Sequence, residues 1–67
     1  MSKFSERLKE LRIGIGLSQL QLSKKLQISH TTIGRWEKGE ISPNIEYIIK
    51  ICRFFKVSTD YMTGVED

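Results

Sequence analysis

Apolar residues recur three and four positions apart along much of the chain, which is the spacing of one face of an α-helix. The first stripe of this kind consists of Phe4, Leu8, Leu11 and Ile15. It predicts a helix from about Lys3 to Ile13 whose apolar face enters the core. The opposite face is charged and is expected to meet solvent; it carries Lys3, Glu6, Arg7, Lys9 and Glu10. Gly14 and Gly16 then break the helix and begin a turn.

Residues 17–39 predict two short helices joined by a sharp corner. Ser18 is a suitable N-cap for the first helix, over residues 19–26, and Gln21 three residues later completes a capping box. Ser29 can cap the second helix, and Gly39 is placed to end it. Two helices of this length at a steep angle, the second of them polar, form the helix-turn-helix pattern.

The second half of the chain predicts two more helices. A wide apolar face, typical of a central helix, is formed by Ile45, Ile48, Ile49, Cys52 and Phe55. Asn44 can cap this helix, and Ser58 can cap a last short helix that Gly64 stops. Ile41, in the loop before them, is expected to reach back into the core. The chain as a whole is therefore expected to be all-α.

The stretch LSQLQLSKKLQISHTTIGRWEKGEISP resembles the phage repressor and Cro type of helix-turn-helix domain, also called the xenobiotic response element type. The tail KVSTDYMTG resembles the end of the same domain. The resemblance runs from about Phe4 to Gly64, and its most specific parts are Ser18, Gln19, Ile33 and Pro43. It implies a compact five-helix bundle that binds a specific duplex DNA sequence, usually as a dimer, to regulate transcription. Gln27 departs from the family, in which many members have glycine because this position often needs a positive φ.

Length and charge agree with this reading. A chain of 67 residues is expected to be a single domain, residues 1–67, with no cleft between domains. Residues 1–39 hold eight basic and three acidic side chains, whereas residues 40–67 hold three basic and five acidic ones. The excess positive charge therefore lies on the half with the two-helix motif, which suits a surface that faces a polyanion.

The sequence gives little support to other classes of protein. No apolar run approaches the roughly 20 residues of a membrane span, and the N-terminus has no signal-peptide segment, so a cytoplasmic protein is expected. The single Cys52 allows no internal disulfide; it is expected to be a buried apolar residue, the alternative being a redox sensor. His30 is the only histidine, and no glycine-rich phosphate loop is present. We expect no enzyme, no metal, no cofactor and no small-molecule ligand.

The resemblance assigns DNA contacts residue by residue. By position, the base-contacting side chains are His30, Thr31 and Arg35. Arg35 could bind guanine O6 and N7 through two parallel hydrogen bonds, which would discriminate by about 1–3 kcal/mol. The expected phosphate contacts, which position the helix without selecting sequence, are Gln19, Ser29, Thr32, Lys38, Asn44 and Arg12. Gly34 either permits close approach to the groove or is merely tolerated.

Two side-chain interactions are also expected. By resemblance, Arg12 pairs with Glu37, fixing the first helix against the third and presenting Arg12 to a phosphate; the alternative is two solvated charges. Trp36 is expected to cover the core beside Ile33, rather than to serve as a stacking platform.

The resemblance also suggests a two-fold contact at the C-terminal edge. The candidate side chains are Phe54, Val57, Tyr61 and Met62. The alternative is that they simply close the core. A dimer would place two reading helices about 34 Å apart and require a pseudo-palindromic operator. The expected function is thus a small transcriptional repressor. The alternatives are an antitoxin or other protein-interaction module that uses this apolar patch, and a decayed domain without a partner.

Overall fold

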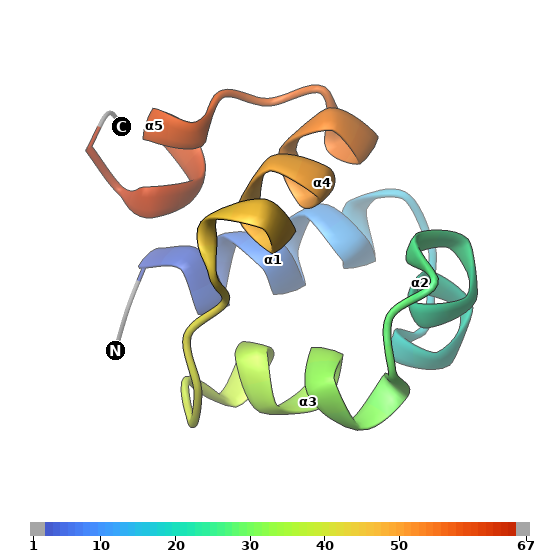
Figure 1. The fold of residues 1–67 in the computed structure, drawn as a ribbon. Coiled ribbons are helices and arrows are strands. Elements are labelled where there is room, and N and C mark those ends of the chain that lie inside the picture. Colours follow the sequence, from blue (N-terminus) through green and yellow to red (C-terminus); the bar gives the residue numbers. More distant parts are fainter. Residues whose placement is uncertain (1–2, 66–67) are drawn as a thin grey trace.

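Five helices make up the described part of the chain, residues 3–65 of this computed structural model (Figure 1). They are α1 (Lys3–Gly14), α2 (Gln19–Leu26), α3 (His30–Lys38), α4 (Ile45–Phe55) and α5 (Thr59–Thr63). No strand occurs within residues 3–65, so the all-α prediction is confirmed. The Cα radius of gyration is 10.6 Å, close to the roughly 11 Å of a compact chain of this length.

In the view of Figure 1, α1 runs across the middle of the bundle. α1 packs against α3 and α5, α2 packs against α3 and α4, and α4 packs against α5. α3 lies along the bottom of the bundle in this view, with α2 to its right. Within residues 3–65, no helix combines the length and apolarity that crossing a membrane requires.

The predicted caps set the helix boundaries. The side chains of Ser18, Ser29, Asn44 and Ser58 each accept a hydrogen bond from the backbone N–H three residues later. At Ser18 the capping box is complete, because its own N–H donates to Gln21 Oε1 at 2.8 Å. Left-handed residues end α2 to α5; they are Gln27, Gly39, Lys56 and Gly64. The expected positive φ of Gln27 is thus present, at 57°.

The core draws on all five helices. Its buried side chains are Phe4, Leu8, Leu22, Leu26, Ile28, Ile33, Trp36, Ile51, Cys52 and Met62. Trp36 meets Phe4 and Tyr47 edge-on, with ring centroids 6.1 and 5.2 Å apart, so its prediction as a cover for the core is confirmed. Ile41 packs against the core from its loop, and Cys52 is buried, both as expected.

Three apolar positions lie outside the core, contrary to prediction. Ile15 is 53% exposed, because α1 ends at Gly14 and the chain leaves the helical phase that placed Ile15 on the stripe. Ile45 and Ile49 are 62% and 38% exposed. The buried side of α4 is centred between Ile51 and Cys52, and Ile49 points roughly 110° away from that centre. Ile45 is the first residue of α4 and lies at the N-terminus of the helix.

Arg7 is the main surprise in α1. It was expected on the solvent face, yet it is buried. Its guanidinium lies 4.3 Å from the centre of the Tyr61 ring, and Nη1 donates to the Tyr61 carbonyl oxygen. A cation–π contact and a hydrogen bond therefore fix α5 against α1. The charge pattern of α1 could not reveal this, because the partner lies 54 residues away.

Candidate nucleic-acid interface

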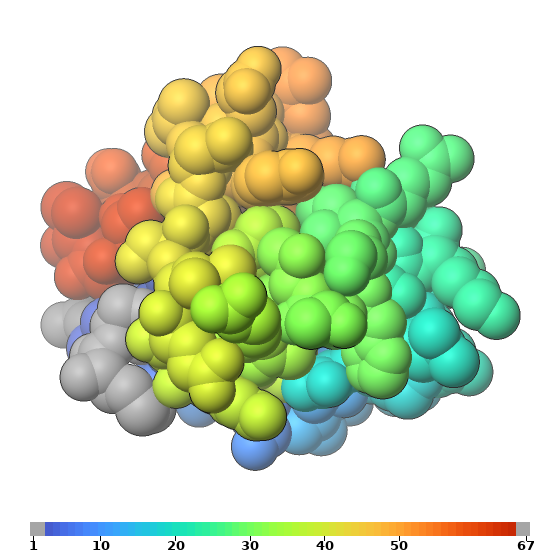
Figure 2. All heavy atoms as spheres, turned by 60° about the horizontal axis from the view of Figure 1, so that its bottom comes forward, coloured from blue at the N-terminus to red at the C-terminus, as the bar shows by residue number. Residues whose placement is uncertain are grey.

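α3 runs across the middle of one face of the molecule (Figure 2). In this view α3 is green, and the yellow segment that follows it and the teal start of α2 flank it. Its inward residues Ile33, Trp36 and Glu37 are buried. The outward residues of α3 are polar or small and cover one continuous side of the helix; they are His30, Thr31, Gly34, Arg35 and Lys38. All three predicted base-contacting side chains, His30, Thr31 and Arg35, are exposed on this side.

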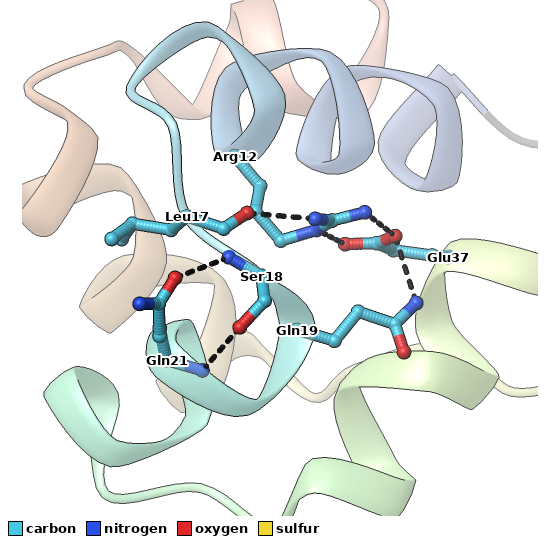
Figure 3. A network of polar contacts seen from close by, with 6 residues as sticks. All are labelled: Arg12, Leu17, Ser18, Gln19, Gln21 and Glu37. Atoms are coloured by element: carbon cyan, nitrogen blue, oxygen red, sulfur yellow. Dashed lines mark hydrogen bonds and ion pairs between the residues drawn. The ribbon is translucent and has the colours of Figure 1, made fainter.

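A buried ion pair joins α1 to α3 behind this face (Figure 3). Arg12 Nε donates to Glu37 Oε2 at 2.7 Å, and Arg12 Nη2 donates to Glu37 Oε1 at 2.9 Å. The two side chains are only 11% and 3% exposed, so the alternative of two solvated charges is wrong. The hydrogen bond to Glu37 is the main cause that raises the pKa of Arg12, and the attraction of the carboxylate adds to it against the opposing effect of burial.

Gln19 connects the same carboxylate to α2. Its Nε2 donates to Glu37 Oε1 at 3.1 Å (Figure 3). To reach it, the Gln19 side chain passes beside Gly34, where an added Cβ would lie 3.4 Å from Gln19 Oε1. Glu37 of α3 therefore holds one residue from α1 and one from α2. The sequence pattern did not predict this second partner of Glu37, because it assigned Gln19 only to a phosphate contact.

Hydrogen bonds within the protein limit the predicted role of Arg12 as a phosphate contact. Its Nη1 donates to the carbonyl oxygen of Leu17 at 2.8 Å, so each of its three guanidinium nitrogens already donates to a protein atom. A guanidinium has five N–H donors, which leaves one on each terminal nitrogen. Arg12 is thus mainly a structural residue in this geometry.

The other predicted phosphate contacts lie around α3 with donors to spare. Lys38 is exposed and Thr32 is half-buried. Ser29 Oγ accepts from the Thr32 N–H at 3.4 Å, and Asn44 Oδ1 accepts from the Tyr47 N–H at 3.0 Å. Both caps use an acceptor, so the Ser29 hydroxyl hydrogen and the Asn44 amide hydrogens remain able to bind a phosphate oxygen.

Arg35 has a partner that the sequence analysis missed. Its Nε lies 3.4 Å from Glu40 Oε1, and the two side chains are 52% and 51% exposed. The cause is the turn at Gly39, whose φ is 77°. The Glu40 N–H donates to the Arg35 carbonyl at 3.0 Å, and the Gly39 N–H donates to the Trp36 carbonyl at 3.1 Å. This is the Schellman pattern, so the glycine after the helix was the signal that could have placed residue 40 beside residue 35.

The predicted two-fold contact needs one correction. Met62 is fully buried in the core, so its prediction as a dimer contact is wrong. α5 turns it inward because the Arg7 contact fixes the adjacent Tyr61 against α1. Phe54, Val57 and Tyr61 are partly buried against the core and keep some exposed surface.

Residues 3–65 enclose no pocket and contain no group of three His, Cys, Asp or Glu side chains that could hold a metal ion. What the described residues offer is a convex, polar helix surface with a rigid connection to the bundle behind it.

Comparisons with known proteins agree with this geometry. A family model described as helix-turn-helix matches residues 8–62. The transcriptional activator BcrR of Enterococcus faecalis is 40% identical over 65 residues, which are 97% of this chain and 32% of that protein. The transcriptional regulator ImmR of Bacillus subtilis is 31% identical over 62 residues, which are 92% of this chain and 49% of that protein. This chain thus spans a third to a half of the length of these relatives.

Among solved structures, the c2 repressor of phage P22 in complex with a synthetic operator has a TM-score of 0.85 to this structure and 27% sequence identity. The match covers 94% of this chain and 96% of that chain.

Proposed function

Because this chain belongs to the helix-turn-helix family, we propose that it is a transcriptional regulator that binds a specific duplex DNA sequence with α3 in the major groove. The family is one of DNA-binding regulators and not a class of enzyme. The observation that supports the proposal most directly is the outward side of α3, polar and exposed along the length of a helix whose inward side is anchored in the core. The major groove admits one helix of this kind.

The base contacts are assigned to the exposed side chains near the start and middle of α3. His30 and Thr31 lie in its first turn, where recognition helices usually meet base edges. Arg35 lies one turn later on the same side and has the donor geometry to bind guanine O6 and N7. Thr31 can bond a base or place its methyl group on thymine.

The phosphate contacts are assigned to the rim of α3. Gln19 is the first residue of α2, where free backbone N–H groups attract an anion, and its side-chain Nε2 keeps one N–H beyond the bond to Glu37 for the same phosphate. Ser29, Thr32, Lys38 and Asn44 complete the set, with Arg12 as a minor contributor through its two remaining donors. These contacts would set the register of α3 without reading sequence.

The chain is proposed to act as a homodimer on a pseudo-palindromic operator. One α3 contacts only a few base pairs, whereas two-fold pairing doubles the contact and places the helices about one DNA turn apart. Phe54, Val57 and Tyr61 are the proposed contacts, because they combine apolar surface with partial exposure.

Repression is the proposed mode, because occupancy of an operator is sufficient for it. A regulator of transcription must reach the chromosome, which supports the prediction of a cytoplasmic location. The alternative of an antitoxin or a protein-interaction module is not favoured, because the relatives are named as transcriptional regulators. A reporter gene placed behind the operator would tell repression from activation by the direction of its change.

The test is selection of bound duplexes from a random pool at two salt concentrations. We expect an inverted repeat with half-sites one helical turn apart. Arg35→Ala should then relax the preference at one base pair per half-site, while Gln19→Ala should weaken binding on all sequences. Arg53→Ala, an exposed arginine on α4, is the matched control and should change neither. Weak, unselective binding that disappears with salt would contradict the proposal, because it would reflect phosphate attraction alone.

A further inference from the structure

The turn at the end of α3 places an acidic side chain beside the proposed guanine reader. The left-handed turn at Gly39 closes two backbone hydrogen bonds, one of which joins the Glu40 N–H to the Arg35 carbonyl at 3.0 Å. Because that bond holds residues 35 and 40 close together at the end of α3, their side chains can meet. Glu40 Oε1 lies 3.4 Å from Arg35 Nε.

The side from which the carboxylate approaches matters for base reading. Its closest approach is to Nε, on the inner edge of the guanidinium. The two terminal nitrogens at the far end keep their donors for other partners. A guanine in the major groove presents O6 and N7 as two adjacent acceptors, which two parallel N–H groups of an arginine match. The ion pair and the guanine contact are therefore compatible on one guanidinium.

We propose that Glu40 is a positioning residue that increases the selectivity of Arg35 for guanine. The proposal rests on the proposed function, since it takes Arg35 to be a base reader. Free in solvent, an arginine can also turn to the nearest phosphate, a contact that every DNA sequence offers. Glu40 opposes that movement in two ways, because it attracts the guanidinium and repels the phosphates. The result is weaker binding to unrelated DNA and a larger difference between guanine and other bases.

Two substitutions separate the charge of Glu40 from its ability to accept a hydrogen bond. Glu40→Ala removes both the charge and the acceptor, and Glu40→Gln removes the charge but keeps an oxygen near Nε. Glu10→Gln on α1 removes the same charge from an exposed position away from α3 and is the matched control. Each variant would be titrated against the selected operator, against operators with another base pair at the position that Arg35→Ala relaxes, and against an unrelated duplex.

Because exposed ion pairs contribute at most about 1 kcal/mol, Glu40→Ala should lower the guanine preference by roughly two- to fivefold and tighten binding to the unrelated duplex. Glu40→Gln should have a smaller effect on the preference. In an Arg35→Ala background, Glu40→Ala should no longer change the preference, because the coupled partner is gone. Glu10→Gln should leave the preference as it is in the unmodified chain.

Three results would overturn the inference. Tighter binding of Glu40→Ala to all duplexes with an unchanged preference would mean that Glu40 acts only through its charge. A greater guanine preference in Glu40→Ala would mean that Glu40 holds Arg35 away from the base. An unchanged preference in Arg35→Ala itself would remove the base reader and the Glu40 role with it, whereas selective binding of the unmodified chain would still support the proposed function.

Discussion

The buried carboxylate of Glu37 provides the most demanding test of the structure. Glu37→Gln keeps the size of the side chain but removes its charge. The oxygen of the new amide can still accept from one guanidinium nitrogen of Arg12, while its NH2 group faces donors on Arg12 or Gln19. Arg12, 11% exposed, would keep a positive charge without a counter-charge.

The expected loss follows from burial. Breaking a buried ion pair by removing one partner costs about 3–5 kcal/mol, because the remaining charge stays out of water. Small domains are stable by only 0.05–0.15 kcal/mol per residue, which for 67 residues is roughly 3–10 kcal/mol. Glu37→Gln should therefore remove a large part of the free energy of unfolding.

Urea unfolding followed by far-ultraviolet circular dichroism would measure it, with the slope of the transition checking that both states keep their compactness. The double variant Arg12→Met with Glu37→Leu leaves no buried charge at this site and should be clearly more stable than Glu37→Gln. Glu40→Gln disrupts a pair whose members are half exposed, and should lower the free energy of unfolding by less than about 1 kcal/mol. Equal, small losses for Glu37→Gln and Glu40→Gln would refute the reasoning, because burial would then make no difference.

Three further predictions concern single positions. Gln27→Gly should raise the free energy of unfolding by up to about 1 kcal/mol, as should Lys56→Gly at the matching turn, because both residues have positive φ, at 57° and 59°; lower melting temperatures would contradict this. Gly34→Ala should raise the melting temperature through a gain of about 1 kcal/mol in helix propensity, since the new Cβ only touches the end of Gln19 at 3.4 Å. If DNA affinity also stays unchanged, close approach of residue 34 to the groove is excluded. Burial raises the pKa of the Cys52 thiol, so its folded pKa lies above the unfolded one. The stability that this group contributes is therefore complete below the unfolded pKa and is lost as the pH rises through the folded pKa. Because the thiol is buried, native protein should react with a thiol reagent far more slowly than urea-unfolded protein.

The local part of the fold was readable from the sequence. The caps at Ser18, Ser29, Asn44 and Ser58 each act within three residues, so residue type and spacing were enough to place the helix starts. Gln27 is left-handed as its resemblance to a glycine position implied. These features depend on short-range geometry, which the sequence states directly.

Contacts between helices were harder. Arg7 was predicted to face solvent because no residue near it in the sequence indicates a contact with Tyr61. Met62 looked like surplus apolar surface because the size of the core is not known until the helices are packed. Ile49 shared the spacing of a core position, but the phase of α4 depends on which neighbours it meets. Helical spacing limits a side chain to a stripe, and tertiary packing then decides how wide the buried part of that stripe is.

The candidate site contains both local features, which the sequence predicts, and contacts between helices, which depend on tertiary packing. Glu37 joins residues of α1 and α2 to α3 through hydrogen bonds of 2.7–3.1 Å among buried or half-buried groups. The backbone of α3 therefore cannot turn without breaking them, and the start of α2 keeps its place relative to α3. Arg35 and Glu40, in contrast, meet at 3.4 Å in solvent, where the pair can open at little cost. An anchored α3 would keep the phosphate contacts in constant register, while its exposed side chains adjust to the bases. Substitutions at Glu37 should therefore alter binding to every DNA sequence, whereas substitutions at Glu40 should alter the preference for one sequence over another.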